Sequence, residues 1–171
     1  MHQEGVSVML LKKGMNLFSI GLVLVILLLS GCDSNDKTMK NNYYLSLSGE
    51  SESWEVDSYE IVIKPDTFKA GNGSLTMKNK TENSTDFFNL EVYAVIDNED
   101  RVVQAKSVKG SESDITQMTM GATEGGTFYD ENGAPISFEN VSDIYMSIEW
   151  QDKSKTMEEK IDLYNQEGFF N

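Results

Sequence analysis

The 171-residue sequence contains one cysteine, one histidine and two prolines, and the first two scarcities exclude whole classes of chemistry. A single cysteine rules out an intrachain disulfide, because a disulfide needs two thiols. The single histidine is His2, so no imidazole occurs after it. Residues 33–171 therefore cannot form a Ser-His-Asp or Cys-His nucleophile system, a zinc site built on histidine and cysteine, or an imidazole general base.

Basic residues are also few. Lysine and arginine total 14 against 28 acidic residues, which gives a formal net charge of −14. This balance opposes binding to nucleic acid and to anionic lipid surfaces, so no nucleic-acid partner is expected. It favours solubility, and it is compatible with a cationic partner or a divalent ion.

The sequence has no apolar run long enough to span a membrane. Its most apolar stretch, Leu17–Leu29, covers 13 residues, whereas a membrane-spanning helix needs about 20. Lys12 and Lys13 precede this stretch, and small residues follow it. A basic start, a short apolar run and small residues are the features of a secretory signal, which is removed from the mature protein.

Leu29, Ser30, Gly31 and Cys32 follow one another at the end of the apolar run. This tetrad resembles the lipobox of bacterial lipoprotein precursors. The resemblance implies diacylglyceryl transfer to the Cys32 sulfur, cleavage before Cys32, acylation with a fatty acid such as palmitate, and retention on the outer face of the bacterial cell membrane. Two acyl chains on one residue suffice for stable anchoring. The alternative is a plain secretory signal followed by an incidental cysteine.

These features divide the chain into three parts. We expect a signal peptide over 1–31, the acylated cysteine and a polar, flexible tether over 32–42, and one domain over 43–171. Removal of 1–31 leaves 140 residues, enough for a single hydrophobic core. The leader carries two lysines and one glutamate, so its loss changes the formal net charge from −14 to −15.

Apolar residues alternate with polar ones along several segments of the domain, the pattern of half-buried β-strands. The alternation shifts phase at Asp57-Ser58, which predicts a bulge within one strand or a turn between two. The clearest alternation runs over 88–96, and a polar turn over 97–100 predicts a hairpin with 101–108. Further strands are predicted at 43–47, 54–56, 59–63, 75–77, 115–120 and 144–150, with a loop over 121–133.

The last segment, 157–164, fits two patterns. Met157, Ile161 and Tyr164 could form one face of a helix, whereas Met157, Ile161 and Leu163 fit one face of a strand with Glu159 as the exception. The short polar link that follows Trp150 favours a hairpin, so we predict a strand.

Seven or eight short strands without a convincing helix predict an all-β fold behind the signal helix. The expected architecture is an immunoglobulin-like antiparallel two-sheet sandwich without the Cys–Trp–Cys pattern of true immunoglobulin domains. In this respect the chain is similar to small uncharacterised Gram-positive lipoproteins with one β-sandwich behind a lipobox. That similarity transfers no functional residue.

Two acidic turns are candidate cation sites. Asp97, Glu99 and Asp100 share one turn, and Asp130 lies in a second with Glu131. Hard oxygen ligands of this kind suit calcium, although solvated hairpin tips explain the same residues. If both turns lay at one end of the sandwich, a shared site would gain support.

Tyr44 and Tyr145 occupy the outward phase of their strands, which makes them candidates for a binding surface. Together these features predict a non-catalytic, membrane-anchored module that binds a protein or envelope component and needs no cofactor. The alternatives are a calcium-binding module and a histidine-free hydrolase that uses two carboxylates on the cell wall.

Overall fold

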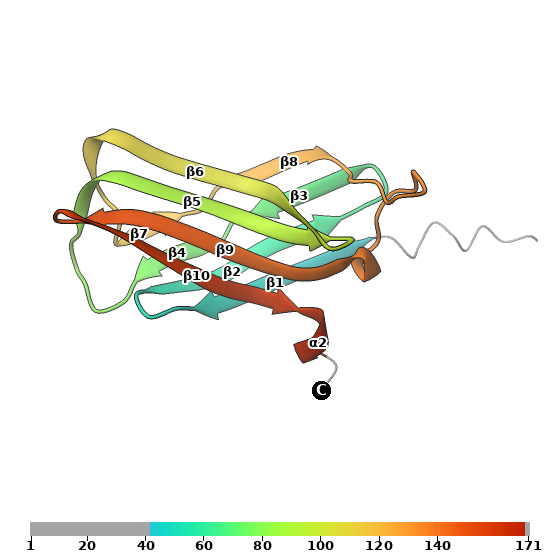
Figure 1. The fold of residues 1–171 in the computed structure, drawn as a ribbon, viewed down its shortest axis with the longest axis horizontal. Helices are drawn as coiled ribbons and strands as arrows, with labels where there is room; N and C mark the ends of the chain where they lie inside the picture. The colour runs from blue at the N-terminus through green and yellow to red at the C-terminus, as the bar shows by residue number, and fades with distance from the viewer. Residues whose placement is uncertain (1–41, 170–171) are drawn as a thin grey trace, which may run out of the picture. The chain divides into compact units, whose positions relative to one another are not determined.

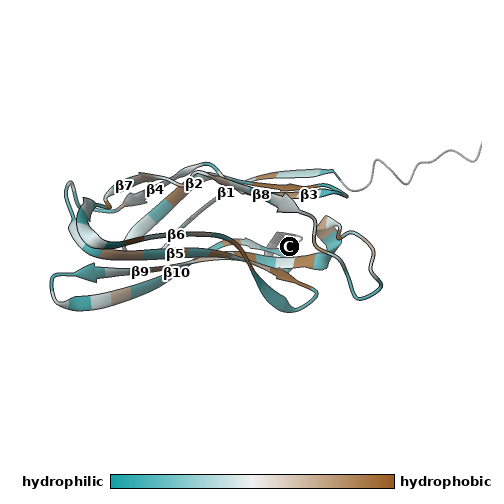
Figure 2. Ribbon diagram, turned by 90° about the horizontal axis from the view of Figure 1, so that it is seen from above, coloured by the Kyte–Doolittle hydropathy of each residue, from teal (hydrophilic) through white to brown (hydrophobic). Residues whose placement is uncertain are grey.

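The computed structural model describes residues 42–169, which form two stacked antiparallel sheets (Figures 1 and 2). The predicted all-β two-sheet sandwich is confirmed, and its first strand begins at Tyr43, where the sequence places the start of the domain. The predicted signal peptide, the tetrad Leu29–Cys32 and the tether up to residue 41 lie outside the described residues. Over 42–169, no helix has the length and apolar character needed to cross a membrane.

The first sheet has six strands, and β2 lies at its centre. One side of β2 pairs with β1, and the other side pairs with β3 and β4, which continue to β8 and β7 respectively. The strands are β1 (Tyr43–Glu50), β2 (Trp54–Ile63), β3 (Thr67–Gly71), β4 (Ser74–Met77), β7 (Gln117–Thr119) and β8 (Ala122–Gly126).

The second sheet has four strands in the order β10-β9-β5-β6. It comprises β5 (Ser84–Ile96), β6 (Glu99–Asp114), β9 (Val141–Asp152) and β10 (Lys155–Asn165), accompanied by the short helices η1 (Phe138–Asn140) and α2 (Gln166–Phe169). The described chain thus has ten strands instead of the predicted seven or eight, because several short pairings carry little apolar signal.

The core lies between the two sheets, where one phase of strands such as β2, β5 and β9 is buried. In β5 the buried side chains include Phe88, Leu90 and Val92, as the alternation predicts. Trp54 of the first sheet and Trp150 of the second meet edge to face at 5.4 Å between ring centroids. Large apolar side chains from both layers therefore supply the main stabilisation of the domain.

A buried polar link also joins the two layers. The Tyr59 hydroxyl of β2 donates a hydrogen bond of 2.9 Å to Gln104 Oε1 of β6, and Gln104 Nε2 donates to the carbonyl oxygen of Met120 at 3.1 Å. Burial raises the pKa of Tyr59, so its hydroxyl keeps the proton that this bond requires.

The phase shift in the second strand is a bulge. β2 continues without interruption through Asp57-Ser58, and its register with β1 shifts between Leu47 and Gly49. Ser58 adopts a φ of 56°, and one extra residue in the strand turns the side chains that follow to the other phase. Trp54, Tyr59 and the residues in phase with them can therefore all face the core.

The prediction of a loop over 121–133 is wrong for residues 122–126. These residues form β8, which pairs antiparallel with β3 from Gly71↔Ala122 to Thr67↔Gly126. All five residues of β8 are exposed, and none is a large apolar residue. The strand is held by backbone pairing at the sheet edge, so no hydrophobic alternation marks it in the sequence.

The strand prediction for 157–164 is confirmed by β10, which forms a hairpin with β9. Glu159, the exception in the strand pattern, is half-buried and lies in phase with the buried Ile161. It accepts hydrogen bonds from Ser51 Oγ and from the Ser53 backbone N–H, the latter at 2.9 Å. The polar residue on the apolar face thus links β10 to the turn between β1 and β2.

Candidate binding cavity at one end of the sandwich

A cavity lies at one end of the sandwich, and its first wall is the tip of the β5–β6 hairpin. Ile96 pairs with Glu99, so only Asp97 and Asn98 form the turn, and their φ values are 51° and 64°. Positive φ at both central positions matches the twist of the flanking strands, and Asp and Asn tolerate it. The predicted four-residue turn over 97–100 is therefore too long, since Glu99 and Asp100 already belong to β6.

The second wall is the loop that follows β8. Asp130 Oδ1 accepts two hydrogen bonds of 2.8 Å, from the backbone N–H groups of Asn132 and Ala134. Tyr129 pairs with Pro135 in an isolated bridge. The Asp130 side chain thereby holds a compact turn in place, as aspartate commonly does.

Asn140 of η1 joins this region to the hairpin tip. Its Nδ2 donates to Asp97 Oδ1 at 3.0 Å, and its carbonyl oxygen accepts the Asp97 backbone N–H at 3.0 Å. Its Oδ1 accepts the Ser137 backbone N–H at 2.9 Å. A single side chain therefore fixes the relative position of two segments more than 40 residues apart in sequence.

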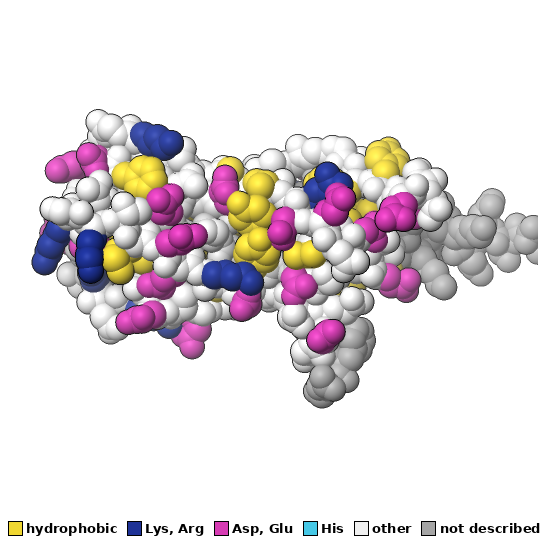
Figure 3. Space-filling model, viewed as in Figure 1, with side chains coloured by type: hydrophobic (Ala, Val, Ile, Leu, Met, Phe, Trp, Pro, Cys, Tyr) yellow, Lys and Arg dark blue, Asp and Glu magenta, His cyan; other side chains and the backbone are white. Residues whose placement is uncertain are grey.

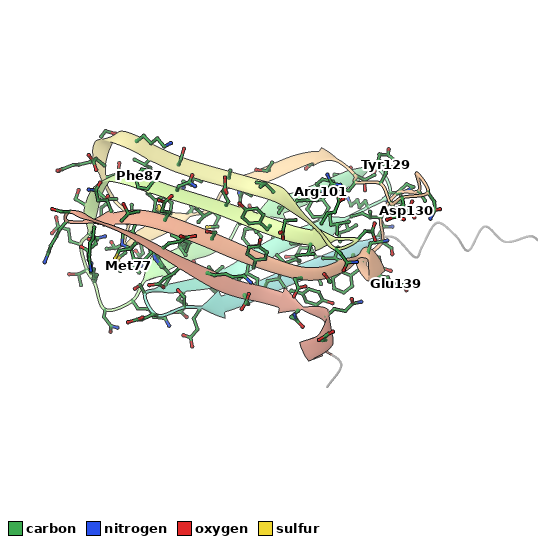
Figure 4. All side chains as sticks on the ribbon, in the orientation of Figure 1. Met77, Phe87, Arg101, Tyr129, Asp130 and Glu139 are labelled. Carbon is green, nitrogen blue, oxygen red and sulfur yellow. The ribbon has the colours of Figure 1, made fainter. Side chains whose placement is uncertain are left out.

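Between these walls lies a cavity of about 380 Å³. Asp97, Glu99 and Arg101 line it from the hairpin, and Tyr129, Asp130 and Glu131 line it from the loop. Figure 4 shows Arg101, Tyr129 and Asp130 at the same end of the sandwich. A second hollow of about 300 Å³ shares Asp97, Asp130 and Glu131 with the first. The cavity is thus acidic, with Arg101 as its one cationic side chain among the described residues.

Thr127 also forms part of the cavity wall. Its side chain is 9% exposed, and its Oγ1 has no hydrogen-bond partner among residues 42–169. A buried hydroxyl without a partner costs about 1–3 kcal/mol. Its Oγ1 is enclosed by protein atoms, so a molecule in the cavity does not reach it.

The structure brings three of the four predicted acidic residues together and separates the fourth. Asp97, Glu99 and Asp130 line the cavity, and Glu99 forms an ion pair with Arg101. Asp100 lies on the opposite phase of β6, where its Oδ1 accepts a hydrogen bond of 3.0 Å from the Tyr145 hydroxyl. In the described part of the chain, no three acidic side chains are grouped as a metal site would require.

Tyr145 lies on the outer face of the second sheet, stacked on Tyr93 with 4.9 Å between ring centroids and 12° between planes. Lys160 Nζ of β10 lies 4.2 Å from the centroid of the Tyr145 ring. Val102 of β6 pairs with Tyr93 on the far side. Figure 3 shows hydrophobic side chains at the middle of this face. Neighbouring side chains cover both faces of the Tyr145 ring, so the ring supports the sheet and offers no open platform.

Both hydroxyls of this stacked pair bond to carboxylates. Tyr93 donates to Glu91, and this bond raises the pKa of Tyr93 to about 12. Burial and the bond to Asp100 raise the pKa of Tyr145. The outer-face pair is thus held in its protonated form, which lets each hydroxyl keep donating.

Tyr44, the other predicted surface residue, belongs to the first sheet and is 62% exposed. Its hydroxyl donates to Glu60 Oε1 at 2.8 Å, and this hydrogen bond raises the pKa of Tyr44. Tyr44 and Tyr145 therefore lie on different layers and do not form one surface.

Sequence reasoning missed Arg101, Thr127, Tyr129 and Tyr93. Alternation along β5 and β6 could have identified Tyr93 as outward and Arg101 as in phase with Glu99. No local pattern marks Thr127 or Tyr129, because they lie in an irregular segment whose path depends on contacts with distant residues.

Comparison of the chain with protein-family models, with curated proteins and with solved structures finds no match. The residues of the chain itself are therefore the basis for assigning a function.

Proposed function

We propose that the mature chain is a lipid-anchored, non-catalytic binding module on the outer face of the bacterial cell membrane, and that the end cavity holds its ligand. The cavity carries this proposal. Its volume of about 380 Å³ lies within the range of about 300–1,000 Å³ typical of ligand pockets. The exposed Tyr129 ring, the carboxylates and Arg101 offer both apolar contact and polar recognition.

The anchor in this proposal is supported by the lipobox resemblance at Leu29–Cys32. The Tyr43 ring contacts Phe138 of η1 at 5.6 Å between centroids, and η1 holds the hairpin tip. The domain therefore begins at the cavity end. Ten residues separate Cys32 from Tyr43.

Metabolic labelling with a clickable palmitate analogue tests the anchor. We expect the wild-type chain to be labelled and to fractionate with membranes, and Cys32→Ala to lose both properties. Ser34→Ala, two residues into the tether, is the matched control and should behave as wild type. A wild-type band without label, or unchanged fractionation of the Cys32→Ala chain, would contradict anchoring.

Capture of envelope components tests the cavity. The full chain, solubilised in detergent, is compared with Tyr129→Ala and with Tyr44→Ala, which removes an exposed tyrosine from the first sheet. We expect the Tyr129 substitution to reduce recovery of the captured component and the Tyr44 substitution to leave it unchanged. Equal recovery by all three chains would place the binding surface elsewhere.

Calcium binding is a second candidate, and the positions of the two acidic turns favour it. Asp97 and Asp130 come from different turns and line the same hollow. Calorimetry with calcium should show a saturable site that the double substitution Asp97→Asn/Asp130→Asn abolishes. Because an asparagine Oδ1 can still accept the bonds that hold both turns, loss of binding would not reflect a lost fold. No heat, together with an unchanged melting temperature, would remove this candidate.

The hydrolase alternative needs one carboxyl group with a raised pKa to serve as general acid. The described carboxyl groups with a displaced pKa, namely Glu50, Glu60, Asp114 and Glu159, are all displaced downward. None of them lines the cavity. Incubation with purified cell walls tests the alternative directly. Release of soluble fragments by wild type but not by Glu99→Gln/Glu131→Gln would show that the domain is a hydrolase and would contradict the non-catalytic proposal.

A further inference from the structure

The strand β8 has one edge without a partner strand among residues 42–169. β3 pairs with β8 from Gly71↔Ala122 to Thr67↔Gly126, and the order of the first sheet ends at β8 (Figure 1). In an antiparallel ladder, alternate residues direct their N–H and C=O groups to the same neighbour. A row of backbone donors and acceptors along β8 is therefore unpaired, and such a row is a template for another strand.

The cover that β6 provides ends just before this strand. Lys106 Nζ donates to the Thr119 carbonyl oxygen at 2.8 Å, and Gln104 Nε2 donates to the Gly121 carbonyl oxygen at 3.2 Å. In the described part of the chain, no side chain forms a hydrogen bond with the backbone of residues 122–126. The edge of β8 is thus open, whereas the segment that leads to it is covered.

The other edges of the two sheets carry features that discourage pairing. β6 carries Lys106 and Lys109, and its register with β5 shifts at two places. β10 carries Lys155 and Lys160, β1 contains a register shift, and β7 has only three residues. Lysines, bulges and short length are the usual protection of an edge strand. β8 contains no lysine, no proline and no register shift.

The inward phase of β8 leaves room for the side chains of an added strand. Thr123 and Gly125 pair with the buried Ala70 and Phe68, so they belong to the inward phase, yet both are exposed. The second sheet therefore does not cover these positions. A Cβ atom at Gly125 would meet nothing within 4 Å. A large apolar side chain on an added strand can cover this glycine from the neighbouring position.

The outward phase of β8 presents one unpaired charge. Glu124 is exposed, and none of the ion pairs of the described residues includes it, although Lys69 lies opposite it in register. Opposite charges that face each other on neighbouring strands attract. A basic residue on an added strand would therefore complement Glu124. The formal net charge of −14 favours a basic partner as well.

A second copy of the chain fits this edge poorly. Pairing of two copies would bring two negatively charged domains together, and these repel each other. A stable dimer buries about 1,200–2,000 Å² in total, whereas β8 offers five residues and no large apolar side chain. A peptide segment can bind through a smaller contact, because main-chain hydrogen bonds supply its affinity.

We infer that the free edge of β8 binds an extended, basic segment of another protein, which joins the first sheet as a further strand. Backbone hydrogen bonds hold the segment, and its alternating side chains give specificity. A basic residue lies opposite Glu124, and an apolar residue lies opposite Gly125. None of residues 122–126 lines the end cavity, so this surface goes beyond the function proposed above.

A labelled peptide tests this inference on the full-length chain in detergent. The probe has seven residues that alternate lysine with valine, and its control has glutamate in place of lysine. We expect saturable binding of the lysine peptide by fluorescence anisotropy, and slower hydrogen exchange of the amides in 122–126 when it is bound. The same peptide with its three central backbone nitrogens methylated keeps every charge but cannot donate to the edge, so it should not bind.

Charge reversal locates the contact. Glu124→Lys should weaken binding of the lysine peptide about fivefold, the upper range for one cross-strand charge pair, and should strengthen binding of the glutamate peptide. Glu55→Lys is the matched control, because Glu55 is exposed on β2 of the same sheet and the substitution changes the net charge equally. It should leave both affinities unchanged.

Each other result overturns the inference. Equal weakening by Glu124→Lys and Glu55→Lys would show a response to net charge alone. Equal binding of the methylated peptide would show that no strand is added. Slower exchange in β6 or β10 but not in β8 would place the binding edge in the second sheet. Dimerisation that slows exchange in 122–126 without peptide would assign the edge to a second copy. The absence of saturable binding would also overturn the inference, and it would leave the proposal for the end cavity intact.

Discussion

Ser51 Oγ donates a hydrogen bond to Glu159 Oε2, although the two residues lie 108 positions apart in the chain. The same carboxylate accepts the Ser53 backbone N–H, and Lys78 Nζ donates to the Ser51 carbonyl oxygen at 2.7 Å. This contact joins β10 to the turn between β1 and β2, across the two layers. A charged acceptor on an otherwise apolar face thus closes one side of the sandwich.

The Glu159 contact predicts a pH-dependent contribution to stability. Burial opposes its ionisation, but the hydrogen bonds from Ser51 and Ser53 outweigh burial and lower the pKa of Glu159 in the folded state. Its contribution is therefore present above the unfolded-state pKa of about 4.3 and is lost as the pH falls through the lower folded value. Glu159→Gln should lower the free energy of unfolding by about 1 kcal/mol at neutral pH.

Urea denaturation of both chains over a pH series measures this effect. The difference between wild type and Glu159→Gln should shrink below pH ~4.3. The neighbouring Glu158→Gln is the control, because Glu158 is exposed on the opposite phase of β10. A difference that stays constant across the series would show that the carboxylate charge is not responsible.

Gly49 predicts a second stability effect, which arises from close packing. A Cβ atom at this position would lie 2.6 Å from the Asp162 carbonyl oxygen and 2.9 Å from Ile161 Cγ2. Gly49→Ala should therefore cost about 1–3 kcal/mol by forcing β1 away from β10. Gly125→Ala is the matched control, since its Cβ would meet nothing within 4 Å. Thermal unfolding of both variants measures the contrast, and equal melting temperatures would contradict the packing account.

Thr127 predicts a gain of stability on removal of a hydroxyl. Thr127→Val removes a buried hydroxyl that has no partner among the described residues, so the domain should gain about 1 kcal/mol. Thr85→Val should lose stability, because Thr85 Oγ1 donates to the Phe87 carbonyl oxygen at 3.0 Å. Chemical denaturation of both variants measures the contrast. Destabilisation by Thr127→Val would show that this hydroxyl already has a partner.

The Tyr93–Glu91 bond predicts a shifted titration on the outer face. The difference in ultraviolet absorbance between wild type and Tyr93→Phe should show phenolate formation near pH 12. Because the folded pKa lies above the unfolded value of about 10, the contribution to stability is complete below pH ~10 and declines as the pH rises. Glu91→Gln should move the titration toward pH ~10, whereas Glu149→Gln on the same face should not. A wild-type step at the unperturbed value would contradict the bond.

Much of the fold could be predicted because the strands of the second sheet bury one phase and expose the other. Phe88, Leu90 and Ile148 belong to runs in which apolar and polar residues alternate, and such alternation indicates a half-buried strand. β8 could not be predicted in the same way. It lies at a sheet edge, its residues are exposed, and its position is set by backbone pairing to β3.

The candidate site was predictable only in part. Asp97 and Asp130 stand out as members of acidic turns, but the sequence does not show that the turns meet. Asn140 decides this by bonding to the hairpin tip. In the sequence, Asp100 is as good a candidate ligand as Asp97. In the structure it lies on the outer face of β6, where it accepts a hydrogen bond from the Tyr145 hydroxyl.

Residue type and short spacing were enough to predict most strands that line the core, the lack of imidazole chemistry after His2 and the resemblance of Leu29–Cys32 to a lipobox. They did not predict β3, although its Phe68 and Ala70 are buried. The tertiary structure alone decided that Asp97, Thr127, Tyr129 and Asp130 share one cavity. The reason is that loops are positioned by contacts between segments far apart in the sequence. Residue type and short spacing do not predict which of these segments come into contact.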